Sequence, residues 1–217
     1  MERFNKHTLA VQRTARFYTI GEANHNTEEL WFVLHGYGQL GNYFIRHFEA
    51  IDNGKRLIVA PEALSRFYVG GEFKRVGATW MTKVEREQEI EDYLQYLNGV
   101  ADHVSSWFPG TPPPITVLGF SQGASTASRW VTLGKLPATR LILWAGNIAH
   151  DLDMGQYAPI LNAMDPVFVV GDNDYYITPE RLAQEKAKME ESNLKITYVP
   201  FEGEHRLYKD VLVSLVR

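Results

Sequence analysis

The chain has 217 residues, of which 45% are apolar and 22% charged, and it contains no cysteine. A chain of this length can bury a substantial core, so we predict a single domain over residues 1–217. The absence of cysteine excludes a disulfide framework, thiolate metal sites and a cysteine nucleophile. The formal net charge is −4 and the sequence has no run of basic residues that could bind a phosphate backbone, so we predict no nucleic-acid partner.

The start of the chain and its apolar segments argue against export and membrane insertion. Residues 1–7 lack the apolar stretch of a secretory signal, and no segment approaches the roughly 18 apolar residues that would span a bilayer. We therefore expect a soluble, cytoplasmic protein that binds no membrane, although a chain without cysteine would also suit an oxidising compartment.

Short apolar runs alternate with helix-like segments along the chain. Residues 8–20 alternate weakly and predict an antiparallel hairpin at a sheet edge. The runs after them are rich in β-formers and nearly continuous, which is typical of parallel strands buried on both faces. These predicted strands are residues 30–34, 57–60, 115–118, 141–144 and 167–170, with 195–200 as the last one.

The predicted helices lie between these strands. Residues 84–108 place apolar side chains three or four apart, and a second helix begins near Ser121. Thr178 and Pro179 are typical N-cap and first-turn residues of a third helix, and residues 206–217 predict a closing one. We therefore predict an α/β domain whose mostly parallel sheet has helices on both faces.

The most specific motif is Gly119-Phe120-Ser121-Gln122-Gly123, which follows a predicted strand and precedes small residues that can open a helix. In this G-x-S-x-G arrangement a sharp turn holds the serine in a strained backbone conformation, and the glycines leave room for it. The hydroxyl then projects at the carboxyl edge of the sheet. We predict that Ser121 is a nucleophile.

A serine nucleophile needs a base and an orienting acid, which in this arrangement follow in the order Ser, Asp or Glu, His. The strand at 167–170 leads into Asp172 and Asp174, and the last strand leads to His205. We predict His205 as the base. Asp174 is the favoured acid because its side chain lies clear of the sheet, whereas Asp172 is an alternative that would instead cap the amides of the turn.

The loop Leu34-His35-Gly36-Tyr37-Gly38 would supply the oxyanion hole. Such a hole uses the amide after the nucleophile and a second amide from a loop of this kind, so we predict the backbone N–H groups of Gln122 and Tyr37 as donors. The two glycines permit a tight path. We interpret His35 as a structural side chain rather than a second base.

The same loop has a competing interpretation. Together with Gly41, its glycines fit the spacing of a dinucleotide-binding fingerprint, and Glu62 after the next strand could bind a ribose. This alternative leaves the serine, aspartate and histidine motifs without a role, so we favour the hydrolase interpretation.

Four motifs make the chain, over about residues 29–217, resemble the α/β-hydrolase fold. More narrowly, it resembles the phospholipase/carboxylesterase family of small serine esterases, which includes acyl-protein thioesterase-like enzymes. The resemblance implies a catalytic triad of Ser121, Asp174 and His205, with the Tyr37 and Gln122 amides as oxyanion donors. The motifs are Leu34–Gly38, Gly119–Ala124, Gly171–Asp174 and Gly203–His205.

Departures from the family bear on the substrate. Gln39 stands where family members commonly have an aspartate, and Trp80-Met81-Thr82 stands where Trp-Phe-Asp is common. Residues 64–82 form the longest predicted irregular stretch, and long ordered loops are often functional. From this stretch we predict the substrate-binding residues Phe67, Tyr68, Trp80 and Met81. Residues 147–165 are too few for a helical cap, which predicts an open site.

We predict a serine esterase that cleaves small-molecule carboxylic esters of short to medium acyl chains through an acyl-enzyme. A thioesterase or lysophospholipase with the same residues is the alternative, and a non-catalytic binding protein on this fold is a further one. We predict no cofactor and no metal, because the sequence shows no ligand spacing such as H-E-x-x-H. The sequence makes no prediction of the oligomeric state.

Overall fold

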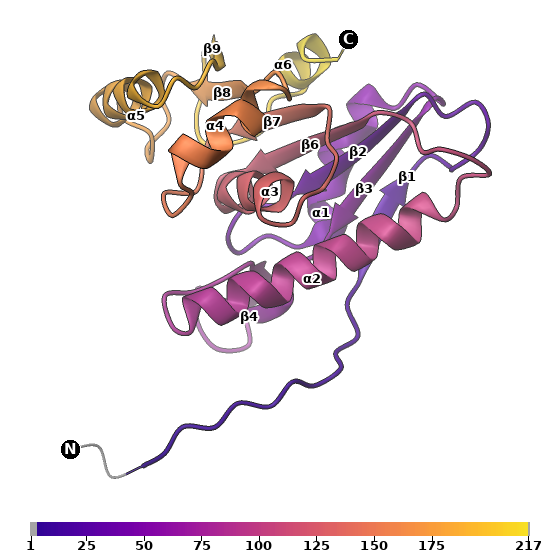
Figure 1. Cartoon of the computed structure of the whole chain (residues 1–217), viewed down its shortest axis with the longest axis vertical. Helices are drawn as coiled ribbons and strands as arrows, with labels where there is room; N and C mark the ends of the chain where they lie inside the picture. Colours follow the sequence, from indigo (N-terminus) through magenta and orange to yellow (C-terminus); the bar gives the residue numbers. More distant parts are fainter. Residues whose placement is uncertain (1–3, 217) are drawn as a thin grey trace.

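The computed structural model describes residues 4–216, and a seven-stranded sheet in the order β1-β3-β2-β6-β7-β8-β9 forms its centre (Figure 1). β1 pairs antiparallel with β3, and the other pairings in this sheet are parallel. The predicted α/β class with a mostly parallel sheet is therefore confirmed. The strands are β1 (Phe17–Ile20), β2 (Glu29–Leu34), β3 (Arg56–Pro61), β6 (Ile115–Phe120), β7 (Arg140–Trp144), β8 (Val167–Gly171) and β9 (Thr197–Phe201).

The helices follow the strands much as predicted, with the long helix and the helices near Ser121 and Thr178 all present. The closing helix is shorter than the predicted 206–217, whose last residue lies outside the described part of the chain. Among the helices within residues 4–216, none is long and apolar enough to cross a membrane. The helices are α1 (Gly41–Phe44), the 3₁₀ helix η1 (Ile45–Ile51), α2 (Arg86–Ser105), α3 (Gln122–Thr132), α4 (Met154–Asn162), α5 (Pro179–Glu191) and α6 (Lys209–Ser214).

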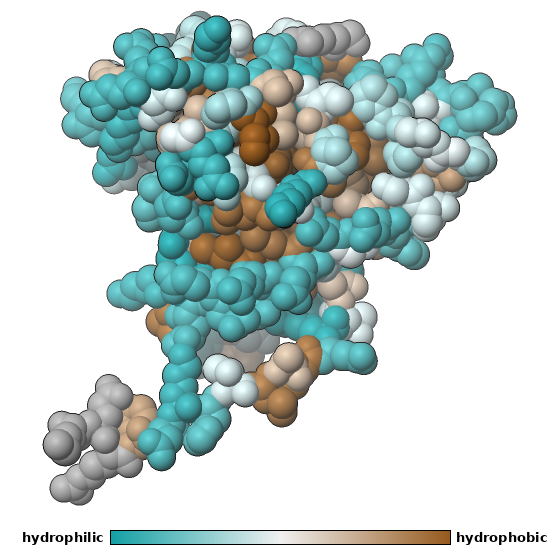
Figure 2. All heavy atoms as spheres, viewed as in Figure 1, coloured by the Kyte–Doolittle hydropathy of each residue, from teal (hydrophilic) through white to brown (hydrophobic). Residues whose placement is uncertain are grey.

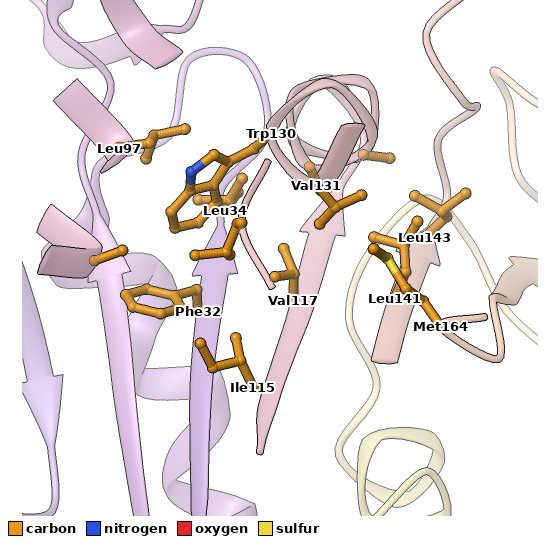
Figure 3. Close-up of a cluster of buried hydrophobic side chains, with 14 of the residues drawn as sticks. Phe32, Leu34, Leu97, Ile115, Val117, Trp130, Val131, Leu141, Leu143 and Met164 are labelled. Carbon is orange, nitrogen blue, oxygen red and sulfur yellow. The ribbon is translucent and has the colours of Figure 1, made fainter. Parts of the chain in front are cut away.

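Two apolar clusters cover the two faces of the sheet. On one face Phe32 and its neighbours pack under Trp130 of α3 and Leu97 of α2 (Figure 3). On the other face Trp31 packs with Phe48 of η1 and Leu212 of α6. The outward side of α2 is hydrophilic (Figure 2), as expected for an amphipathic helix lying on a sheet. Because successive residues of a strand point to opposite faces, continuous apolar strands serve both clusters.

The N-terminal prediction was wrong in one respect. Residues 8–20 contain a single strand, β1, and residues 5–16 are irregular and lead away from the sheet past α2 (Figure 1). A hairpin needs a tight turn, and residues 8–16 contain no Gly, Pro, Asn or Asp that would favour one. β1 instead finds its antiparallel partner in β3.

Residues 64–82 also differ from the prediction, because they are not irregular. They form an antiparallel hairpin of β4 (Ser65–Val69) and β5 (Arg75–Thr79). Gly70 and Gly71 at its tip have φ angles of +77° and +120°, which glycine adopts without steric cost. The hairpin lies beside the predicted oxyanion loop, because Phe67 packs on Tyr37 and Ala78 pairs with Gln39.

Residues 147–165 contain α4 rather than a separate cap. Ala158 and Leu161 of this helix are buried in the same cluster as α3, so α4 covers the sheet and does not cover the predicted site. Asp153 begins the helix by accepting a hydrogen bond from the Gly155 amide.

Candidate active site

The predicted site residues come from loops at the carboxyl ends of four parallel strands. The loop from His35 follows β2, Ser121 follows β6, Asp174 follows β8 and His205 follows β9. Parallel strands bring their carboxyl ends to one edge of the sheet, and ligand sites of open α/β sheets lie along that edge. Four distant segments of the sequence therefore meet in space.

Ser121 stands at the turn between β6 and α3 with φ +55° and ψ −117°, a conformation rare for a residue with a side chain. The glycines on either side of it are required because backbone atoms of other residues approach them closely. A Cβ atom on Gly119 would lie 2.2 Å from the Gly123 oxygen, and one on Gly123 would lie 2.2 Å from the Leu34 oxygen. The strained turn is thus held between β2 and α3, and the N-terminus of α3 begins directly after Ser121.

A hydrogen-bonded chain joins three of the predicted residues. The Ser121 Oγ lies 2.9 Å from His205 Nε2, and His205 Nδ1 lies 2.7 Å from Asp174 Oδ2. An ionised carboxylate only accepts hydrogen bonds, so Nδ1 carries the proton and Nε2 is left to accept the hydroxyl proton of Ser121. This is the tautomer that a general base requires.

The Asp174 side chain is held in place by backbone donors. Its residue is only 5% exposed, and its Oδ1 accepts hydrogen bonds from the amides of Tyr176 and Ile177 at 2.8 and 3.1 Å. One carboxylate oxygen therefore binds the turn, and the other faces His205.

Asp172 has a different set of partners. Its Oδ1 accepts hydrogen bonds from the Gly203 amide and from the Asn173 side chain, at 2.9 and 2.8 Å. Asp172 thus ties the end of β8 to the loop after β9, and the structure brings Asp174 rather than Asp172 to His205.

The imidazole of His205 contacts two aromatic rings. The Phe120 ring centroid is 5.1 Å away and its residue is buried, whereas the Tyr176 ring stands edge-on at 4.7 Å and its residue is 59% exposed. Edge-on contacts at this distance are favourable for aromatic rings.

The predicted oxyanion loop lies against Ser121. A Cβ atom on Gly36 would lie 3.1 Å from the Ser121 Cβ, so this position tolerates little more than hydrogen. The Gly36 amide donates to Gln39 Oε1 at 2.7 Å, and the Gly38 amide donates to Ala78 O at 2.8 Å. The Gln39 side chain therefore stabilises the conformation of the loop through this hydrogen bond.

Two amides beside Ser121 remain available to a ligand. Within residues 4–216, the backbone N–H groups of Tyr37 and Gln122 donate no hydrogen bond to the protein. Tyr37 lies on the loop that packs against Ser121, and Gln122 is the first residue of α3. Unpaired donors next to a candidate nucleophile are what an oxyanion hole requires.

His35 is fully buried beneath this loop. Its Nδ1 lies 2.8 Å from Gly36 O, and its Nε2 accepts a hydrogen bond from the Ala63 amide at 3.0 Å. Burial lowers the pKa of this imidazole to about 4, because desolvation disfavours the cation. His35 therefore links two loops as a neutral group, as the sequence predicts.

The predicted substrate-binding residues do not lie together. Trp80 is only 3% exposed, stacks on His35 and donates from its indole nitrogen to His35 O at 2.8 Å. The Trp80 ring supports the loop from within the core, and a role in substrate binding stays a prediction. Met81 is partly buried, with its sulfur 3.8 Å from the Arg129 guanidinium.

The hairpin residues behave differently from Trp80 and Met81. Phe67 packs on Tyr37 with ring centroids 5.0 Å apart, which places it beside the oxyanion loop. Tyr68 is half exposed and packs on Phe73 instead. Neighbouring residues of a strand point to opposite sides, so Phe67 and Tyr68 cannot line the same wall.

The side chain of Gln122 has a role that the sequence analysis missed. Its Oε1 accepts a hydrogen bond from the Trp80 amide at 3.1 Å, and its Nε2 donates to Met81 O at 2.9 Å. The residue after Ser121 thus fastens the end of β5 to the site. No local sequence signal indicates this contact, because the partners lie about forty residues apart.

An ion pair between buried Arg129 and the more exposed Asp151 was also missed. Arg129 of α3 binds Asp151 through two guanidinium nitrogens, with contacts of 2.7 to 3.1 Å, and Tyr93 through a third at 3.2 Å. Arg129 and Arg86 hold the pKa of Asp151 at about 2, against the opposing effect of burial. The cluster connects α2, α3 and the segment before α4.

The dinucleotide alternative finds no support in the geometry. The carboxylate of Glu62 is buried. It binds the Arg16 side chain at 2.7 Å and accepts a hydrogen bond from the Gly41 amide at 3.1 Å. Both carboxylate oxygens of Glu62 therefore already have partners, one of them the Arg16 side chain next to β1, and neither is placed to bind a ribose. Among residues 4–216, no group of three or more His, Asp or Glu side chains is placed to hold a metal ion.

Comparisons with known proteins identify the family and the fold of this chain. A family model described as serine hydrolase (FSH1) matches residues 27–207, and the chain belongs to that family. The class that the sequence resembles, small serine hydrolases of the α/β-hydrolase fold, is thereby confirmed, although the matching model is FSH1 rather than the phospholipase/carboxylesterase family. A search of curated proteins finds no match.

Solved structures with the same fold include three hydrolases. Acyl-protein thioesterase 2 of Zea mays has a TM-score of 0.69 and 13% identity, over 93% of this chain and 96% of that one. Esterase PE8 has a TM-score of 0.66 and 19% identity, with the same coverage. A phospholipase/carboxylesterase of Dyadobacter fermentans has a TM-score of 0.63 and 16% identity, over 95% and 96% of the two chains. At these identities the similarity shows the α/β-hydrolase fold.

Proposed function

We propose that this serine hydrolase is an esterase that cleaves carboxylic esters of short to medium acyl chains. Ser121 is the nucleophile, His205 the general base and Asp174 the orienting acid. The observation that carries the proposal is the hydrogen-bonded chain from Ser121 Oγ through both ring nitrogens of His205 to Asp174 Oδ2. A strained serine at a strand-to-helix turn supports the same conclusion.

The reaction proceeds in two steps on these residues. His205 Nε2 takes the hydroxyl proton as Ser121 Oγ attacks the acyl carbon, and the carbonyl electrons move to the oxygen beside the Tyr37 and Gln122 amides. Asp174 stabilises the resulting imidazolium, which then protonates the departing alcohol as its bond to the acyl carbon breaks. Water repeats the sequence in place of Ser121 and releases the acid. The residues supply all the proton transfers, so the proposal includes no cofactor or metal.

A thioesterase is the second candidate, and the fold shared with the maize acyl-protein thioesterase favours it. Esters and thioesters give the same acyl-enzyme, so the geometry of Ser121 and His205 serves both. The choice depends on the leaving group. Lysophospholipid hydrolysis would need a long acyl chain to be bound as well.

A cytoplasmic location and the lack of a nucleic-acid partner stay predictions.

Two measurements on the purified protein test the proposal. A fluorophosphonate should label one residue, and peptide mapping should place the label on Ser121. The rates with p-nitrophenyl butyrate and with the butyryl thioester of N-acetylcysteamine, which share an acyl group, then decide between the two candidates. A higher kcat/KM for the thioester after correction for its intrinsic reactivity would favour the thioesterase. Absence of labelling and of hydrolysis would support the non-catalytic alternative instead.

A further inference from the structure

The surface beside His205 carries an exposed aromatic side chain with no role in the reaction described above. Tyr176 stands edge-on to the imidazole at 4.7 Å and is 59% exposed. Phe120, which contacts the same imidazole, is buried in the core. Of the two rings that contact His205, only Tyr176 can also touch a bound molecule.

The backbone of Tyr176 is fixed on both sides. Its amide donates to Asp174 Oδ1 at 2.8 Å, and its carbonyl accepts a hydrogen bond from the Arg181 guanidinium at 2.9 Å. The ring therefore projects from a braced turn, and its position relative to His205 does not depend on a mobile loop. A fixed ring can contact a ligand with little further loss of conformational freedom.

The chemistry of the proposed reaction determines which part of a substrate meets this ring. The carbonyl oxygen must face the Tyr37 and Gln122 amides, whereas the leaving oxygen must come within reach of His205 Nε2 to receive its proton. The alcohol part of the ester therefore lies on the His205 side. Tyr176 packs directly against His205 and is exposed, so a leaving group held next to His205 also comes near this ring.

We propose that Tyr176 forms a subsite for the leaving group and that this subsite favours alcohols carrying an aromatic ring. The inference rests on the proposed esterase function and names the class of alcohol that the site accepts. A ring next to the ester oxygen can pack against the exposed part of Tyr176, and aromatic pairs gain stabilisation beyond that of buried area alone. Tyr176 is thus a specificity-determining residue.

Three acetate esters test the subsite: benzyl, cyclohexylmethyl and ethyl acetate. All three give the same acetyl-enzyme, so differences in kcat/KM report only binding and the first step. In Tyr176→Ala the ratio of kcat/KM for benzyl over ethyl acetate should fall about five- to tenfold, and in Tyr176→Phe it should stay near the wild-type ratio. The ratio for cyclohexylmethyl over ethyl acetate should fall less than the benzyl ratio.

Tyr175→Ala is the matched control, because Tyr175 is the neighbouring tyrosine, is 83% exposed and packs on Tyr176 rather than on His205. Its benzyl to ethyl ratio should stay within twofold of wild type. The pH dependence of kcat/KM for ethyl acetate should also keep its shape in Tyr176→Ala, because a role only in orienting His205 would change it.

Several results would overturn the inference while the esterase assignment stands. Equal losses for all three esters in Tyr176→Ala, an equal loss of the benzyl and cyclohexylmethyl ratios, or the same change in Tyr175→Ala would each remove the aromatic subsite. Failure of the proposed function looks different: the wild type would hydrolyse none of the three esters, or Ser121→Ala would hydrolyse them as fast as wild type.

Discussion

Two aspartates lie two residues apart after β8, and their carboxylates have different partners. Asp174 faces His205 Nδ1, whereas Asp172 binds the Gly203 amide. Replacing the orienting acid by asparagine removes the charge that stabilises the imidazolium and favours the wrong tautomer, so Asp174→Asn should lower kcat by roughly 10⁴. Asp172→Asn is the isosteric control and should lose less than tenfold. A larger loss at Asp172 would reverse the assignment.

At the residue scale, motifs predict the hydrogen-bonded chain but not its surroundings. Ser121 is recognisable because few arrangements place glycines two residues before and after a serine between a strand and a helix. The structure brings Asp174 to His205, but the turn chemistry expected from the sequence was wrong: Asp174 itself accepts hydrogen bonds from the turn amides, and Asp172 binds the Gly203 amide instead. The burial of Trp80 could not be predicted, because an aromatic residue in an apparent loop has no local signal that its indole reaches His35 O, 45 positions away.

At the scale of elements, the buried histidine that joins two loops predicts a pH-dependent stability. His35 has its pKa lowered to about 4 by burial, against an unperturbed 6.5. Above pH 6.5 the imidazole is neutral in both states and its contribution is complete. As the pH falls from 6.5 towards 4, the unfolded chain binds a proton that the folded chain excludes, so stability is lost over that window.

Urea unfolding at pH 7 and pH 4.5 measures this effect. Between these two values His35 should account for a loss of about 2 kcal/mol in the free energy of unfolding. His35→Gln, which cannot ionise, should lower stability at pH 7 but lose about 2 kcal/mol less on acidification. Equal losses in the two proteins would show that other groups cause the acid sensitivity.

The elements themselves were predicted unequally. Continuous apolar strands and the amphipathic α2 are strong periodic signals, and all of them appear in the structure. The β4–β5 hairpin was missed because its strands, although as long as β7 and β8, are partly exposed and of mixed polarity instead of continuously apolar. The edge strand β1 was predicted with a partner from its own segment, but pairing with β3 depends on tertiary contacts that no local pattern encodes.

At the scale of the whole molecule, the open site predicts a preference for short acyl chains. α4 packs on the sheet instead of covering the site, so no lid over Ser121 comes from residues 147–165. Each buried methylene can contribute up to ~0.8 kcal/mol, but further carbons gain little once they reach water. With p-nitrophenyl esters, kcat/KM should therefore peak at short or medium chains and should not jump when detergent micelles form. A steady rise to palmitate would instead indicate a lipase or lysophospholipase.

The central claim is that Ser121 is the nucleophile of an ester hydrolase, and its most direct test is the kcat of Ser121→Ala with p-nitrophenyl acetate. Ser125→Ala is the matched control, because the Ser125 hydroxyl lies one turn further along α3 and donates to Asn147 O. We predict a loss of at least about 10⁴ in kcat for Ser121→Ala, with unchanged folding, and less than a tenfold loss for Ser125→Ala. Retention of more than about a tenth of the wild-type activity by Ser121→Ala would contradict the claim.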